Sequence, residues 1–61
     1  MNVMIARKKK KLTQKQICEA VGISRSVLSK IENGEDMRVP KELMLKLAEA
    51  LDTDVQTLFF S

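Results

Sequence analysis

A glycine between two short amphipathic segments, Gly22, constrains this chain most. Upstream of it, Thr13 and Gln16 have the spacing of a capping box, in which the hydroxyl and the amide each bond a free backbone N–H at a helix start. A helix is therefore predicted to begin at Gln14. Gly22 can adopt the left-handed backbone that ends helices, so this helix is expected to stop at about Val21.

A second helix is predicted directly after this turn. Ser24 is placed to cap it, and Asn33 with Gly34 to terminate it. The side chains expected to face the core at helical spacing are Val27, Leu28 and Ile31. The polar side chains left on the outward face are Arg25, Ser26, Ser29 and Lys30.

Apolar spacing predicts one helix before this pair and one after it. Val3 and Ala6, with the stem of Lys10, predict a short helix over roughly residues 2–10. Pro40 favours the first position of a helix. The stripe expected on the inner face of that helix consists of Leu43, Leu47, Ala48 and Leu51.

The C-terminal segment predicts a fifth helix. Thr53 and Gln56 have the spacing of a second capping box, and Val55, Leu58 and Phe59 would form the inner face. No alternating apolar pattern of useful length indicates a strand. The fold class is therefore expected to be all-α, a compact five-helix bundle.

Length and charge narrow the functional classes. A chain of 61 residues is expected to form a single domain, residues 1–61. The apolar start before Lys8–Lys11 is too short for a signal peptide or a membrane span, so a soluble, cytoplasmic protein is expected. The net charge of +3 suits a polyanionic partner. The chain has no histidine, and Cys18 is its single cysteine. We therefore expect that the protein is not an enzyme and has no metal site, cofactor or small-molecule ligand.

The segment from Gln14 to Asn33 resembles the helix-turn-helix motif of the phage repressor and Cro family. The matching positions are Gln14, Ile17, Val21, Gly22, Ile23, Leu28, Ile31, and the run Ile31 to Gly34. The resemblance extends from Val3 to Phe59 and implies a lambda-repressor-like fold and a transcription regulator, most often a repressor. In two positions the chain departs from the family pattern: Lys11 replaces a common glycine, and Cys18 a common alanine.

The helix after Gly22 is expected to enter the major groove of double-stranded DNA, where each base pair shows a distinct pattern of donors and acceptors. Arg25 can bond guanine O6 and N7 together, and Lys30 can reach a further guanine or a phosphate. The predicted base-reading residues are Arg25, Ser26, Ser29 and Lys30. On composition alone a solvated helix face is the better interpretation of these side chains. The surrounding helix-turn-helix motif reverses that preference.

Phosphate contacts are expected around the motif. Free backbone N–H groups at the start of the helix that begins at Gln14 attract an anion, and the family resemblance implies the same role for Gln14 and for Asn33. The full predicted set is Gln14, Thr13, Lys15, Asn33, Lys11 and Arg38. The run Lys8–Lys11 is interpreted as a solvated helix end rather than an arm inserted into a groove.

A homodimer on a near-palindromic operator is expected, because one recognition helix makes too few base contacts for specificity. Leu58, Phe59 and Phe60 are the predicted dimer contacts, since the two rings cannot both lie in their own core. For Phe60 a frayed terminus is an equal alternative. Alternative functions are an antitoxin, a restriction-modification controller, or a protein-interaction module on the same fold.

Overall fold

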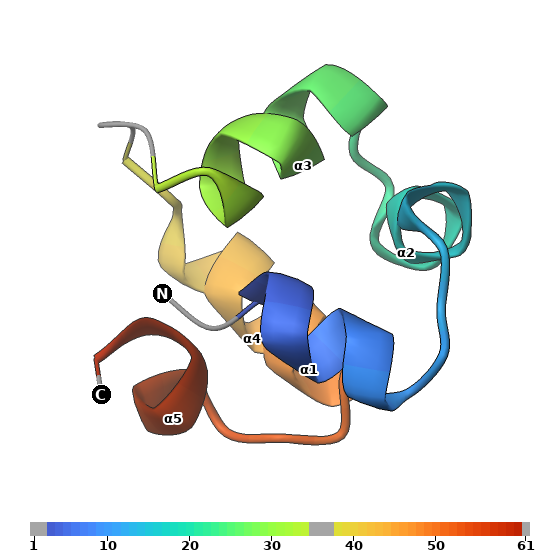
Figure 1. Cartoon of the computed structure of the whole chain (residues 1–61). Coiled ribbons are helices and arrows are strands. Elements are labelled where there is room, and N and C mark those ends of the chain that lie inside the picture. The colour runs from blue at the N-terminus through green and yellow to red at the C-terminus, as the bar shows by residue number, and fades with distance from the viewer. Residues whose placement is uncertain (1–2, 35–37, 61) are drawn as a thin grey trace.

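Five helices form in the computed structural model, which describes residues 3–34 and 38–60 (Figure 1). They are α1 (Val3–Lys9), α2 (Gln14–Val21), α3 (Arg25–Glu32), α4 (Lys41–Ala50) and α5 (Val55–Phe59). The described residues contain no strand, so the all-α prediction is confirmed. Figure 1 shows α2 and α3 on one side of the molecule, and α1 crossing in front of α4 with α5 on the opposite side.

The start and end of α2 are fixed as the sequence predicts. The hydroxyl of Thr13 accepts from the backbone N–H of Gln16 at 3.1 Å, and the backbone N–H of Thr13 donates to the Gln16 side chain at 2.8 Å. Gly22 then takes a left-handed φ of 83° and its N–H donates to the carbonyl of Cys18. The backbone hydrogen-bonding groups at both ends of α2 are thereby partly satisfied.

The cap of α3 also matches the prediction. The Ser24 hydroxyl accepts from the backbone N–H of Val27 at 3.2 Å. After Glu32 the chain leaves the helix through Asn33 and Gly34, and Gly34 has a φ of 70°. The turn between α2 and α3 is therefore bounded by Gly22 and Ser24.

Two predicted helix starts are wrong by one residue. Pro40 has φ −59° and ψ 147°, so it precedes α4 instead of occupying its first position, and the helix begins at Lys41. At α5 the predicted pair of Thr53 and Gln56 does not form a capping box. The Asp54 carboxylate caps this helix instead, because it accepts from the backbone N–H of Thr57 at 2.6 Å.

The cap of α5 is electrostatically favourable. Hydrogen bonds from the Thr57 backbone and then from its side chain stabilise the charged carboxylate of Asp54. They lower the pKa of Asp54 below its usual value of 3.8. The acid at the start of this helix therefore stays ionised to a lower pH than a free aspartate.

The core lies where all five helices meet. Its buried members are Val3, Ile17, Cys18, Val21, Leu28, Ile31, Leu47, Ala48, Leu51 and Leu58. Val27, Leu43, Val55 and Phe59 pack against this core while partly buried. Lys10 is exposed beyond the end of α1, and its Nζ lies 3.9 Å from Asp52 Oδ2. The predicted contribution of the Lys10 stem to the inner face of the first helix is therefore wrong.

The turn after α1 shows the strain that the missing glycine predicts. Lys11 has a φ of 58°, in the left-handed region that costs a residue with a Cβ about 1–2 kcal/mol. Asp52, between α4 and α5, has a similar φ of 54°. Of the helices in the described part of the chain, none has the length and apolar character to cross a membrane.

Candidate nucleic-acid interface

The outward face of α3 carries polar side chains that form no hydrogen bond or ion pair with the rest of the described chain. Arg25, Ser26 and Lys30 are exposed, and Ser29 is half-buried. Among residues 3–34 and 38–60, these side chains make no hydrogen bond and no ion pair. Leu28 and Ile31, on the opposite face, are fully buried. The helix is thus anchored by one face and offers the other for contact.

Gln14, at the first position of α2, is tied to the end of α3. Its amide Nε2 donates to Glu32 Oε1 at 2.9 Å. An amide nitrogen carries two N–H groups, so one remains for another acceptor. The bond joins the two helices on the side of the motif where α2 begins.

The same carboxylate holds α1. Arg7 Nε donates to Glu32 Oε2 at 2.7 Å, and Arg7 Nη2 donates to Glu32 Oε1 at 3.3 Å. Arg7 Nη1 also donates to the carbonyl of Leu12 at 2.9 Å. The Arg7 and Glu32 side chains are only 12% and 3% exposed, so water screens this ion pair weakly. We call Arg7, Glu32 and Gln14 the carboxylate hub.

The carboxylate hub was not among the predictions made from the sequence, although a signal was present. Arg7 lies four residues after Val3, and Glu32 four residues after Leu28, which puts each on the buried face of its helix. Two opposite charges at core-facing positions predict a buried ion pair, because an unpaired buried charge is very costly.

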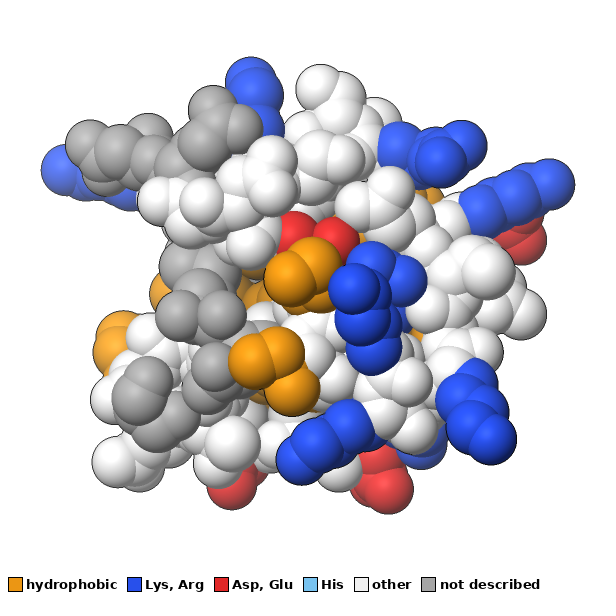
Figure 2. Space-filling model, in the orientation of Figure 1, with side chains coloured by type: hydrophobic (Ala, Val, Ile, Leu, Met, Phe, Trp, Pro, Cys, Tyr) orange, Lys and Arg blue, Asp and Glu red, His pale blue; other side chains and the backbone are white. Residues whose placement is uncertain are grey.

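The remaining predicted phosphate contacts lie around the motif. Thr13 and Lys15 flank the start of α2, and Lys11 occupies the strained turn before it. Asn33 follows α3, and Arg38 lies in the segment before α4. All five are exposed. Figure 2 shows Lys and Arg side chains spread across the face it draws instead of gathered in one patch.

The predicted dimer contacts differ in accessibility. Leu58 is 1% exposed and Phe59 is partly buried against the core, so both are already used within the chain. Phe60 is 68% exposed. Of the three, Phe60 alone leaves most of its side chain accessible.

The described residues contain no group of three or more His, Cys, Asp or Glu side chains placed to hold a metal ion. Cys18 is a free thiol buried among the core residues.

Comparisons with known proteins agree with this geometry. A family model described as "Helix-turn-helix" matches residues 3–58. The solved structure of a "SinR protein/SinI protein complex" contains a similar chain, with a TM-score of 0.88 and 27% sequence identity. The similarity covers 98% of this chain and 58% of that one, so this chain spans little more than half of its length. No curated protein sequence matches.

Proposed function

Because the chain belongs to the helix-turn-helix family of DNA-binding transcription regulators, we propose that it is a repressor that reads operator DNA with α3 in the major groove. The observation that carries the proposal is the outward face of α3. Its polar side chains have no partner within the described chain, while the opposite face is buried. A helix held in this way can enter the groove without losing internal bonds.

Each side chain on this face has a distinct role in the proposal. Arg25, in the first turn of α3, donates two parallel bonds to guanine O6 and N7. Ser26 bonds an adjacent base edge, and the half-buried Ser29 lies close to the base edges or the sugar-phosphate chain. Lys30, one turn after Ser26, reaches a further guanine or a phosphate. Arg25 contributes most to sequence discrimination because its contact is bidentate.

The carboxylate hub sets the geometry of this contact. Glu32 holds the start of α2 and the end of α3 together through Gln14, and Arg7 braces both against α1. The first backbone N–H groups of α2 and the second N–H of the Gln14 amide then bind one phosphate. The surrounding backbone anchors in the proposal are Thr13, Lys15, Asn33, Lys11 and Arg38.

A homodimer completes the proposal. Two copies related by a two-fold axis place their α3 helices about 34 Å apart, which matches one turn of a near-palindromic operator. Phe60 is the proposed contact because its ring is the most exposed of the chain's large hydrophobic side chains within the described residues. The proposal contains no catalytic step, in keeping with a chain that lacks histidine.

The test is a fluorescence-anisotropy titration of labelled DNA from the region upstream of the gene, at two salt concentrations. The wild-type chain is compared with the double variant Arg25→Ala, Lys30→Ala. The matched control is Lys41→Ala, Lys46→Ala, which removes the same charge from exposed positions of α4. All three proteins are also titrated with random DNA.

We expect wild type and control to prefer the operator to random DNA by about 10³-fold or more, and the α3 variant to lose that preference. Weak, equal binding of all three proteins to both DNAs contradicts the proposal. An equal loss in the α3 variant and the α4 control also contradicts it, because that result indicates nonspecific attraction by net charge.

A second candidate function is a helix-turn-helix protein that acts through a protein partner, as an antitoxin does. Two observations favour it: the similar SinR structure is a complex with a second protein, SinI, and Leu45 of this chain is 51% exposed on α4. Under this candidate, Leu45→Asp abolishes capture of the partner while operator binding is retained. Loss of operator binding in the same variant contradicts it.

A further inference from the structure

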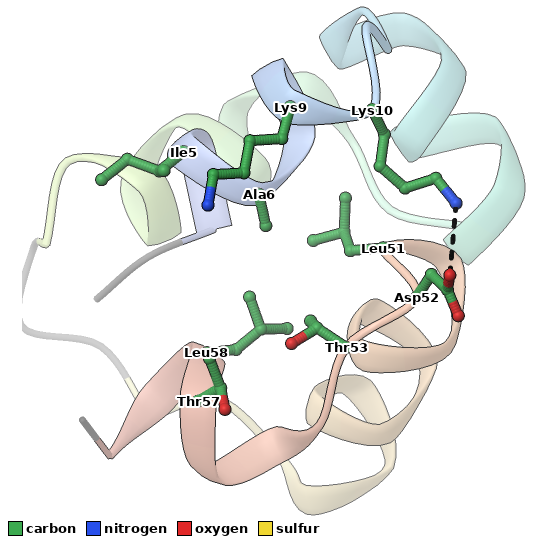
Figure 3. A pocket seen from close by; sticks show the side chains of 9 residues that line it. All are labelled: Ile5, Ala6, Lys9, Lys10, Leu51, Asp52, Thr53, Thr57 and Leu58. Carbon is green, nitrogen blue, oxygen red and sulfur yellow. Dashed lines mark ion pairs between the residues drawn. The ribbon is translucent and has the colours of Figure 1, made fainter.

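The outward face of α1 combines apolar and basic side chains. Met4 and Ile5 in the first turn are 39% and 53% exposed, and the exposed Lys8 and Lys9 follow in the next turn. Helical spacing puts all four on the side opposite the buried Val3, and Figure 3 shows Ile5 and Lys9 next to one another along the helix. Neither lysine forms an ion pair within residues 3–34 and 38–60. We call these four residues the α1 face.

The outward face of α4 has the complementary character. Leu45 is 51% exposed, and the exposed Glu42 and Glu49 lie three residues before it and four residues after it, so they border it along the helix. In the described part of the chain neither carboxylate forms an ion pair. Lys41 and Lys46 flank this stripe on its two sides. We call Glu42, Leu45 and Glu49 the α4 face.

Charge is distributed along the whole sequence in the same sense. Residues 1–18 contain six basic residues and no acidic one, whereas residues 41–61 contain two basic and four acidic residues. Opposite charge on two parts of one surface steers two copies of a chain into a head-to-tail orientation. The long-range attraction thus acts in the direction that would bring the α1 face of one copy to the α4 face of another.

The two faces point away from one another. α1 buries Val3 and α4 buries Leu47 in the same core, and Figure 1 shows α1 in front of α4. The surfaces opposite these buried residues therefore lie on different sides of the molecule. One copy can use its α1 face and its α4 face at the same time, with two different neighbours.

The spacing on the two helices also matches. With Ile5 of one copy on Leu45 of a second copy, Lys9 and Glu49 each lie four residues further along, which is about 6 Å on both helices. The reversed direction is equally suitable, because Lys8 and Glu42 are each three residues from the apolar side chain. Apolar contact and opposite charges therefore coincide in either direction.

We propose that the α1 face of one copy binds the α4 face of the next, in a head-to-tail contact that can repeat. A two-fold contact through either face is disfavoured, because it pairs the lysines of two α1 helices or the glutamates of two α4 helices. The contact is smaller than the standard interface of about 1,200–2,000 Å², so it is weak in free solution, with a Kd of about 1 mM. Adjacent operators would raise the local concentration of the protein and make its binding cooperative. This last consequence rests on the proposed function, whereas the contact itself does not.

The test needs no DNA. Sedimentation velocity and two-dimensional NMR of the wild-type chain are recorded from about 0.05 to about 2 mM, which brackets the expected Kd. We expect the sedimentation coefficient to rise with concentration and the amide signals of α1 and α4 to move together, both to a smaller extent at high salt.

Two variants identify the faces. Ile5→Glu and Leu45→Lys should each weaken the association about tenfold, because each loses an apolar contact and sets like charges opposite one another. Mixing the two variants should restore association, since the first keeps an intact α4 face and the second an intact α1 face. A contact between two copies of the same face cannot give this result.

The controls change charge outside both faces. Gln56→Glu and Gln56→Lys, at an exposed position of α5, make the same charge changes and should leave the association unchanged. Phe60→Ser removes the two-fold contact of the proposed function and should also leave it unchanged, so the two interfaces can fail separately. Circular dichroism verifies that each variant is folded.

Three results overturn the proposal. Wild-type signals that do not move with concentration exclude the contact and assign Leu45 to a different partner. Loss of association in only one of Ile5→Glu and Leu45→Lys indicates a two-fold contact through that face. Loss in both variants without restoration in the mixture shows that the two faces do not bind each other.

Discussion

Replacing Glu32 by glutamine tests whether the carboxylate hub stabilises the fold. Glu32 accepts two hydrogen bonds from Arg7 and one from Gln14, and thereby links α1, α2 and α3. Glutamine keeps the length of the side chain and one acceptor oxygen, but removes the negative charge. The guanidinium of Arg7 then stays largely buried with only neutral acceptors, the carbonyl of Leu12 and the amide oxygen of the glutamine, and no counter-charge.

The expected loss is large for a chain of this size. Removing one partner of a buried ion pair costs about 3–5 kcal/mol. We expect about 3 kcal/mol, the lower end of that range, because Arg7 is 12% exposed and keeps its bond to Leu12. A 61-residue domain has a total free energy of unfolding of about 3–9 kcal/mol. At about 4–8 °C per kcal/mol, Glu32→Gln should lower the Tm by about 12–24 °C.

The assay is thermal and urea unfolding followed by far-ultraviolet circular dichroism. The matched control is Asp52→Asn, which breaks an exposed pair with Lys10 at 3.9 Å and should cost less than about 1 kcal/mol. The double variant Arg7→Met, Glu32→Leu removes both charges and should cost less than Glu32→Gln. If Glu32→Gln costs no more than Asp52→Asn, the reasoning from burial is refuted.

Two further predictions concern backbone strain and pH. Lys11→Gly should stabilise the chain by about 0.5–1 kcal/mol in urea unfolding, because relief of the left-handed strain exceeds the added freedom of glycine in the unfolded chain. Its counterpart Gly22→Ala, at φ 83° with open space around the added Cβ, should destabilise by about 0.5–1 kcal/mol, because the same entropy difference offsets part of the strain. A gain in stability there would contradict the strain argument. The pKa of Asp54 is lowered in the folded state, so its contribution to stability is present above its usual value of 3.8 and is lost as the pH falls through the lower folded value. Asp54→Asn keeps an oxygen that can cap the helix but does not titrate in this range. The free energy of unfolding of this variant should therefore fall less with decreasing pH than that of the wild-type chain. An equal fall in both proteins would contradict the assignment to Asp54.

Local hydrogen bonding explains why the helix-turn-helix segment was predictable. The bonds between Thr13 and Gln16, and the left-handed turn at Gly22, depend on neighbours in the sequence. The start of α5 was not predictable in the same way, because Thr53 and Asp54 are adjacent residues that can both cap a helix. The choice between them depends on which register buries Leu58, and that is a matter of tertiary packing.

The site was predictable in part for a related reason. Periodicity alone separates Arg25 and Lys30 from the buried Leu28, so the outward face of α3 follows from the sequence. The carboxylate hub joins residues far apart along the chain, Arg7 and Glu32, whose geometry depends on how α1 and α3 cross.

The outward face of α3 separates two properties that proteins often couple. Arg25, Ser26 and Lys30 contribute no hydrogen bond or ion pair to the described fold, whereas Ser24, Leu28 and Glu32 hold the helix in place. Exchanging the first set should leave the melting temperature nearly unchanged. The helix can therefore be given new side chains by mutation or by design, one position at a time, while the scaffold that presents them stays the same.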